Sequence, residues 1–181
     1  WVRPSGCAER GAWCAASMRS RRVRGLVGIC RGRRPGRVVD VQVSAIARHA
    51  VWWDASVYLG PLVAFVLYAL IDGEACLEAL LFGSLRVAKL ASSDMVYRGE
   101  AMRYLAELMW NPDAILYNRE LTWHVHAPDR FSASIGSGSR HCEVTFILYA
   151  AGDVGLIEAD DRPRTVGGRL IPTPWGSDEH T

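Results

Sequence analysis

The first residues that could do chemistry lie in one predicted helix. Between Gly99 and Leu116 the sequence reads GEAMRYLAELMWNPDAIL, and its polar side chains include Glu100, Arg103, Tyr104 and Glu107. Two carboxylates could exchange protons with a substrate. Glu100 and Glu107 are about 10 Å apart along a helix, however, which is too far for one shared proton. We therefore favour an Arg103–Glu107 ion pair that fixes the helix in place.

Three histidines are the second group with chemical potential. His124 and His126 stand two residues apart, so they share one face of a predicted strand. His141, on a later strand, could supply a third metal ligand. Because no carboxylate follows at a spacing typical of a metal site, we expect no metal and no cofactor.

The segment GSGSR, residues 136–140, is rich in glycine and could suggest a phosphate-binding loop. Such a loop needs the N-terminus of a helix behind it, and this segment lies between two predicted strands. It is therefore predicted to be a hairpin loop. The sequence also lacks the G-x-S-x-G pattern of a nucleophile elbow, and we assign no catalytic residue.

Large aromatic side chains complete the set of candidate site residues. Tryptophans on the inner face of a sheet can line an apolar ligand pocket, or they can simply be part of the core. Both alternatives remain open from the sequence. The residues that we predict to bind a ligand are Arg103, Tyr104, Glu107, Trp110, Trp123 and Trp175.

The helix that carries most of these residues is predicted from its apolar spacing. From Glu100 onward, apolar side chains recur with helical period at Met102, Leu105, Leu108 and Met109. Gly99 is expected to start the helix, and the Asn-Pro pair at 111–112 is expected to end it near Trp110. A second short turn should run over 113–116. We predict that this helix plugs one face of a sheet.

The flanking segments favour strands. Residues 38–46 and 50–59 nearly alternate, 63–71 is more uniformly apolar, and a turn is expected at Gly60-Pro61. The segment 72–90 fits either a helix or a strand pair broken at Gly83-Ser84. After the plug, segments 121–127, 131–135, 141–150 and 156–161 form a predicted β-meander. The fifteen-residue apolar run 57–71 is shorter than the roughly 20 residues of a spanning helix, so we expect no transmembrane segment.

Charge divides the chain into a head and a body. Residues 1–40 contain ten arginines and only two acidic residues, whereas residues 41–181 have a net charge of −6. We predict a disordered tail over 1–40 and a single α+β domain over 41–181. The alternative, a nucleic-acid-binding arm, is disfavoured because no aromatic residue lies among the arginines from Arg19 to Arg37.

The cysteines and the N-terminal sequence indicate the cellular compartment of the protein. The five cysteines are an odd number without a C-x-x-C pair, so we expect free thiols in a reducing compartment. No signal peptide is visible. The prediction is a cytoplasmic or unassigned location.

Three motifs, with the predicted meander strands between the second and the third, give a resemblance to a known family. VWWDA at 51–55, GEAMRYLAELMWNPDAIL at 99–116 and VGGRLIPTPW at 166–175 occur in this order. Together they resemble a mainly bacterial family known only as a domain of unknown function, whose signatures are G-E-x-x-R-Y-L-A-E-x-x-W-x-P and G-R-x-x-P-T-P-W. The resemblance covers roughly residues 42–175.

The chain differs from the family signature at two positions and at both ends. Asn111 and Asp113 replace an aromatic and a small residue, and the family continues beyond the point where this chain ends. The chain is thus expected to be incomplete at its C-terminus and divergent at its N-terminus. The resemblance implies a mainly antiparallel α+β fold with a curved sheet clasping short helices, similar to the half-barrels of lipoprotein carriers. It implies no activity.

These observations lead to one functional hypothesis and two rivals. The leading hypothesis is a non-enzymatic binding domain for an apolar small molecule or a lipid, with no nucleic-acid partner. One rival is an enzyme of unknown class that uses Arg103, Tyr104 and Glu107. The other is a purely structural or interaction module. The sequence does not predict an oligomeric state.

Overall fold

The computed structural model describes residues 24–30, 36–45, 47–71, 73–90 and 92–178. The chain divides into two compact units. Unit 1 runs to Ala45 and resumes over Ala50–Ser92, and unit 2 consists of Ile46–His49 and Ser93–Thr181. We describe each unit by itself. The single domain predicted over 41–181 stays a prediction.

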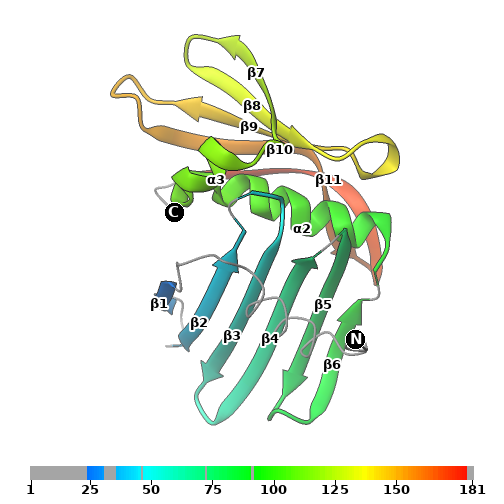
Figure 1. The fold of residues 1–181 in the computed structure, drawn as a ribbon. Helices are drawn as coiled ribbons and strands as arrows, with labels where there is room; N and C mark the ends of the chain where they lie inside the picture. Colours follow the sequence, from blue (N-terminus) through cyan, green and yellow to red (C-terminus); the bar gives the residue numbers. More distant parts are fainter. Residues whose placement is uncertain (1–23, 31–35, 46, 72, 91, 179–181) are drawn as a thin grey trace. The chain divides into compact units, whose positions relative to one another are not determined.

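Unit 1 is an open antiparallel sheet in which each strand pairs with the next one along the chain (Figure 1). Its strands are β1 (Arg24–Cys30), β2 (Gly36–Ser44), β3 (Val51–Leu59), β4 (Leu62–Ile71), β5 (Glu74–Leu81) and β6 (Leu85–Leu90). The predicted turn at Gly60-Pro61 is confirmed, and Gly60 takes the positive φ of 61° that the turn requires. For 72–90, the strand-pair alternative is correct, with its turn over 82–84.

The core of unit 1 is built from small and aliphatic side chains. One cluster of it consists of Ala45, Ala50, Leu67, Ala69 and Ile71, with Trp52 and Cys76 packed against it. Cys76 is disulfide-bonded, so the expectation that every cysteine is a free thiol is wrong.

The first two strands overlap the segment that we predicted to be a disordered tail. β1 and the first residues of β2 lie within 1–40 and pair over their whole length. Apolar residues at Leu26, Val27, Ile29, Val38 and Val39 explain how this stretch forms strands despite its arginines. Residues 1–23 and 31–35 lie outside the described residues.

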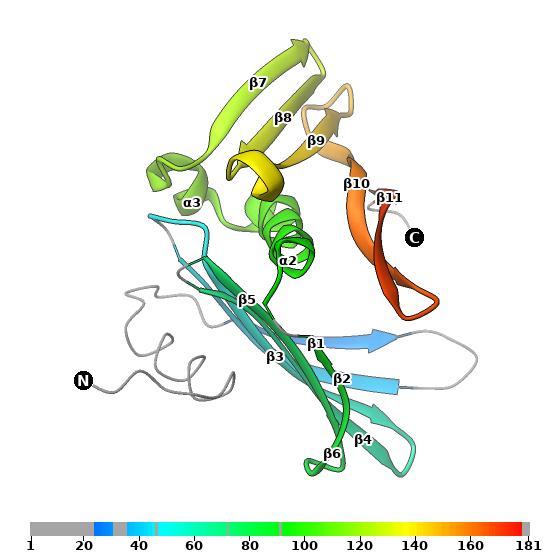
Figure 2. The same ribbon diagram turned by 90° about the vertical axis from the view of Figure 1, so that its right-hand side faces the viewer.

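Unit 2 contains the predicted helix and meander. Its helical segments are α2 (Asp94–Ala106), the 3-10 helix η1 (Glu107–Trp110), α3 (Pro112–Tyr117) and the 3-10 turn η2 (Gly138–Arg140). Its strands are β7 (Thr122–Ala127), β8 (Arg130–Ile135), β9 (Cys142–Leu148), β10 (Val154–Val166) and β11 (Arg169–Asp178). They form one antiparallel sheet in the order β11-β10-β9-β8-β7, so the predicted meander is confirmed. Figure 2 shows α2 end-on beside this sheet.

The helix starts earlier than predicted. Ser93 is its N-cap, and the Ser93 side chain accepts a hydrogen bond of 3.3 Å from the backbone N–H of Val96. Gly99, expected at the start, therefore lies inside α2, where its backbone faces Pro163 of β10. The predicted end is confirmed: η1 stops at Trp110 and Pro112 opens α3.

Three of the four residues of the predicted apolar stripe are buried, and the fourth, Met109, is partly exposed. Met102, Leu105 and Leu108 are almost completely shielded from solvent. Helix α2 contacts β8, β9, β10 and β11, and buried side chains such as Val144 and Phe146 of β9 complete the core of unit 2. The helix is therefore packed on the sheet through its apolar stripe.

The fold is mainly antiparallel β with one main helix, as predicted. Among the described residues neither sheet is closed or strongly curled, so the half-barrel resembling lipoprotein carriers is wrong. Each sheet keeps two unjoined edge strands, β1 and β6 in one and β7 and β11 in the other. In the described part of the chain, no helix has the length and apolar character needed to cross a bilayer.

Candidate functional site

A pocket of about 390 Å³ lies in unit 2, where the end of α2 and the segment η1 meet strands β10 and β11. We call it the Trp110–Trp175 pocket. Its lining residues are Arg103, Ala106, Glu107, Met109, Trp110, Ile157, Arg162 and Trp175.

The charged side of this pocket is fixed by two contacts. The Arg103 Nε atom lies 2.9 Å from Oε1 of Glu107, which confirms the predicted i,i+4 ion pair. On the strands β10 and β11, the guanidinium carbon of Arg162 lies 4.4 Å from the centre of the Trp175 ring. This is a cation–π contact, which holds the indole and the guanidinium together.

The rest of the lining is apolar. Met109 and Trp110 come from η1, and Ile157 comes from β10. Trp110 is 54% exposed, so its ring is available to a molecule entering the pocket rather than committed to the core. The lining thus combines two indoles, one thioether and one aliphatic side chain with a small number of charged side chains.

Glu100 adds a buried acid beside the pocket. It lies three residues before Arg103 on α2 and seven residues before Glu107, the first residue of η1. Glu100 is 6% exposed, and its Oε2 atom has no hydrogen-bond partner among the described residues. Burial raises the pKa of Glu100 to about 7, against the opposing attraction of Arg103 and Arg162.

The pocket gathers four of the six residues that we predicted to bind a ligand: Arg103, Glu107, Trp110 and Trp175. Tyr104 is instead buried in the core, where its hydroxyl accepts a 2.9 Å hydrogen bond from Asn118 Nδ2 and its pKa rises to about 12 because of burial. Trp123 lies on the edge strand β7, its ring 5.9 Å from that of Phe131. That any of these residues binds a ligand stays a prediction.

Sequence reasoning missed Arg162 and Ile157. Both lie on β10, and the register between β10 and β11 shifts between Ala159 and Arg162. A bulge changes which side chains share a face, so simple alternation could not show that these residues meet Trp175. The signals in the sequence are Asp160 and Asp161 at the register shift and Pro163 just after it, since Asp and Pro are unfavourable in a regular strand.

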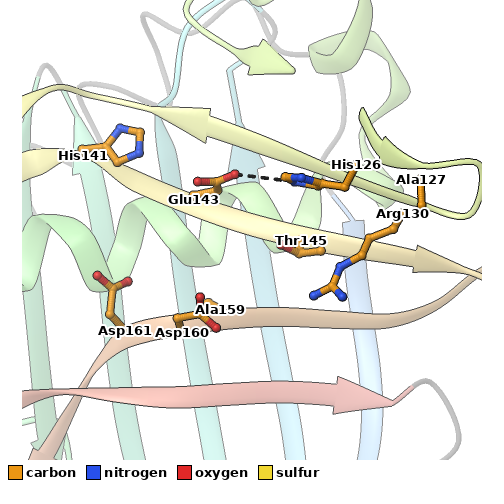
Figure 3. Close-up of a pocket in the computed structure, with 9 residues that line it drawn as sticks. All are labelled: His126, Ala127, Arg130, His141, Glu143, Thr145, Ala159, Asp160 and Asp161. Carbon is orange, nitrogen blue, oxygen red and sulfur yellow. Dashed lines mark ion pairs between the residues drawn. The ribbon is translucent and has the colours of Figure 1, made fainter. Parts of the chain in front are cut away.

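A second pocket of about 620 Å³ opens over strands β7 to β10 and is lined mainly by polar side chains (Figure 3). His126 and Glu143 face each other across it, with 3.9 Å between Nε2 and Oε1. Ser132 lies between them: it donates to Glu143 and lies 2.9 Å from His126 Nε2. Ser132 itself is only 1% exposed and is not among the residues that line the pocket.

The predicted histidine pair does share a face, with ring centres 4.6 Å apart. His141 lines the same pocket as His126 (Figure 3). Even so, within the described residues no three histidine, cysteine or acidic side chains gather as metal ligands. The segment 136–140 joins β8 to β9 through η2, which confirms the predicted hairpin loop.

A third polar cluster joins three separate parts of unit 2. His49 Nδ1 lies 2.5 Å from Oε2 of Glu120, and His49 Nε2 lies 2.7 Å from the hydroxyl of Tyr97. A carboxylate only accepts hydrogen bonds, so the proton of neutral His49 lies on Nδ1 and Tyr97 donates to Nε2. These two hydrogen bonds tie His49 to α2 and to the segment before β7.

Comparison with known proteins gives one match. No curated protein and no solved structure matches the chain. A family of unknown function, DUF6544, matches residues 27–179, which extends the region of resemblance to include part of β1 and all of β2. Because this match covers most of the sequence, the chain belongs to the DUF6544 family.

Proposed function

We propose that unit 2 is a binding domain for a small apolar or lipid-like molecule, which occupies the Trp110–Trp175 pocket. The observation that supports this most directly is the lining itself. Trp110, Met109, Trp175 and Ile157 surround a space of about 390 Å³. Ligand pockets usually have volumes of roughly 300–1,000 Å³ and mostly apolar walls with a few polar groups.

The lining also suggests how such a ligand would gain affinity. Trp110 exposes more than half of its surface. Covering apolar area contributes about 25 cal/mol per Å². Aromatic walls give this area at little cost in side-chain entropy, because an indole has few rotatable bonds.

The enzyme alternative has less support. It requires Arg103, Tyr104 and Glu107 to act together, but Tyr104 is not among the residues that line the pocket. The Tyr104 hydroxyl is bonded to Asn118 instead. Burial also raises its pKa, so this phenol is a poorer proton donor than an exposed tyrosine.

Calorimetric titration with 1-octanol, a neutral apolar probe, tests the proposal. We expect saturable binding, and we expect Trp110→Ala and Trp175→Ala each to weaken it by about fivefold or more, since each loses roughly 1 kcal/mol of apolar contact. Trp123→Ala is the matched control, because Trp123 lies in the same unit but outside the pocket. Equal weakening by all three substitutions, or no binding to the unaltered protein, would contradict the proposal.

A further inference from the structure

We infer that unit 1 docks on the surface of a lipid bilayer through the ends of two of its hairpins. These ends are residues 57–63, where β3 turns into β4, and residues 80–85, where β5 turns into β6. We call them the hairpin tips. The inference concerns unit 1 alone and does not depend on the pocket of unit 2.

The two hairpin tips form one continuous surface. β4 pairs with β5 as far as Ala64 and Leu81. Beyond this pair, the backbone N–H of Phe82 donates a 2.8 Å hydrogen bond to the carbonyl oxygen of Val63. Figure 1 and Figure 2 both show the two turns at the same end of the sheet. A surface that meets one tip therefore also meets the other.

The hairpin tips are apolar and uncharged. Their sequences are VYLGPLV and LLFGSL, in which no residue carries a charge. The nearest charged residue along β6, Arg86, is paired with Glu78 of β5 at 2.7 Å. Four large apolar side chains of the tips are between 44% and 60% exposed: Leu59, Leu62, Phe82 and Leu85. Exposed apolar side chains that gather in one place indicate an interaction surface.

The apolar side chains point to both sides of the sheet at this end. Leu59 and Leu62 are register partners and share one face. Tyr58 and Phe65, which are 38% and 37% exposed, lie on the other face, because successive residues of a strand point to opposite sides. A protein that packs on one face would leave the other face in water. The acyl chains of a bilayer surround an inserted tip, so a bilayer covers both faces.

Phe82 has a backbone conformation that its side chain disfavours. Its φ is 53°, and among the described residues it is the only one other than glycine with a positive φ. Gly83 follows with a φ of 71°, and the N–H of Ser84 closes the turn on the carbonyl oxygen of Leu81 at 3.3 Å. Two-residue hairpin turns with positive φ at both central positions normally contain Asn-Gly or Asp-Gly.

The turn itself therefore does not explain the phenylalanine. A bulky residue with a positive φ costs free energy, and such strain is found where function maintains it. The Phe82 side chain is 56% exposed, so much of its apolar area is not used in packing within unit 1. Insertion into a bilayer buries this area.

The insertion should be shallow. The backbone of a turn carries N–H and C=O groups whose hydrogen bonds hydrocarbon cannot satisfy. Apolar side chains at the boundary between headgroups and acyl chains reach roughly 5–10 Å into the bilayer. Tyr58 suits this boundary, because its ring is apolar and its hydroxyl is polar. Binding should thus be reversible and should depend on each inserted side chain.

Co-sedimentation of the full chain with phosphatidylcholine vesicles tests the inference. These vesicles have no net charge, so the arginines of residues 1–40 gain no attraction from anionic lipid. We expect saturable binding that persists when the salt concentration is raised to about 1 M, since salt screens charges but does not weaken apolar insertion.

Phe82→Asn is the decisive variant, because asparagine tolerates a positive φ and gives the usual Asn-Gly turn. We expect it to weaken vesicle binding by about tenfold or more, since an amide replaces an inserted apolar ring. Its thermal unfolding should occur at the same temperature as that of the unaltered protein or at a higher one.

Two further variants complete the test. Leu62→Asn changes the other hairpin tip and should also weaken vesicle binding by about tenfold. Leu116→Asn is the matched control, because Leu116 of α3 is 74% exposed and lies outside the tips. This control should bind vesicles as the unaltered protein does.

The inference is wrong if the unaltered protein does not bind the vesicles, or if Leu116→Asn weakens binding as much as Phe82→Asn does. It is also wrong if the protein ignores vesicles but sediments as a dimer that Phe82→Asn dissociates, since the tips would then join two copies of the chain. If Phe82→Asn unfolds at a lower temperature, Leu62→Asn decides: unweakened binding by that variant overturns the inference. None of these results changes the expectation for octanol binding in unit 2.

Discussion

Glu100 shows how one buried side chain can make the stability of a domain depend on pH. Its pKa is raised from 4.5 to about 7, mainly by burial. The folded state therefore binds this proton more tightly than the unfolded state does. The stability that comes with the proton is fully present below the unfolded pKa of 4.5 and is lost as the pH rises through the folded pKa of about 7.

Comparing the free energies of unfolding of Glu100→Gln and the unaltered protein at several pH values should reveal this dependence. At low pH both proteins carry a neutral side chain, and their free energies of unfolding should be similar. Above neutral pH the variant should be more stable by about 3 kcal/mol, because a shift of one pKa unit corresponds to about 1.4 kcal/mol. Denaturant unfolding of both proteins across this pH range measures the difference. A difference that does not change with pH would show that Glu100 ionises equally easily in both states.

At the scale of elements, the connection between β8 and β9 depends on one glycine. Gly136 has a φ of 76°, and a Cβ atom placed there would overlap the carbonyl oxygen of Arg140. Gly138 in the same loop has a φ of 58°, but a Cβ atom there would meet nothing within 4 Å. The two positions thus separate the cost of the backbone conformation from the cost of the overlap.

We expect Gly138→Ala to lower the free energy of unfolding by about 1 kcal/mol, the usual cost of a left-handed conformation in a residue with a Cβ. Gly136→Ala should lower it further, by at least about 1 kcal/mol more, because the backbone of η2 must also move. Thermal unfolding of the two variants makes the comparison. If both variants lost the same free energy of unfolding, the loop would be able to relieve the overlap at position 136 without a further cost.

The elements also show what the sequence could and could not reveal. Near-alternation, apolar runs and turn residues located β3, β4 and the β7 to β9 meander. Buried residues alternate clearly along β9, whereas the residues of β7 are nearly all exposed. The start of α2 was predicted at Gly99 because glycine often interrupts a helix, whereas Ser93 is the residue that caps this one. The half-barrel was wrong because periodicity describes the faces of a strand and not the curvature of a sheet.

The candidate site was predictable only where its residues share the helix. Arg103, Glu107 and Trp110 follow from spacing along α2 and η1. Trp175 was singled out by its motif and Arg162 not at all, because their meeting depends on the pairing of β10 with β11. The register of such long-range strand pairs depends on the whole fold, so it could not be predicted from this one sequence.

At the scale of the whole molecule, the chain enters unit 2 twice. Residues Ile46–His49 belong to unit 2 although they connect β2 and β3 of unit 1, and the chain returns to unit 2 after Ser92. His49 is the residue of the first passage that bonds to Glu120 and Tyr97. The stability of unit 2 should therefore depend on a segment that is distant in sequence.

We expect His49→Ala to cost about 1–3 kcal/mol, since it leaves the buried Tyr97 hydroxyl without the partner seen here. In a Tyr97→Phe background the same substitution should cost clearly less, because no hydroxyl remains to be satisfied. Urea unfolding of the four proteins completes the cycle. Additive losses would mean that the hydrogen bond between His49 and Tyr97 contributes nothing.

Cys142 begins β9 with its thiol packed inside unit 2, where Sγ lies 3.3 Å from the carbonyl oxygen of Arg140. Burial raises the pKa of this free thiol to about 11, so almost no thiolate exists at neutral pH. Alkylating reagents attack the thiolate, and they need a path to it. Cys142 is therefore unreactive toward alkylating reagents while α2 stays packed on the sheet of unit 2. A molecule in which Cys142 has been alkylated is one whose unit 2 has opened at least once.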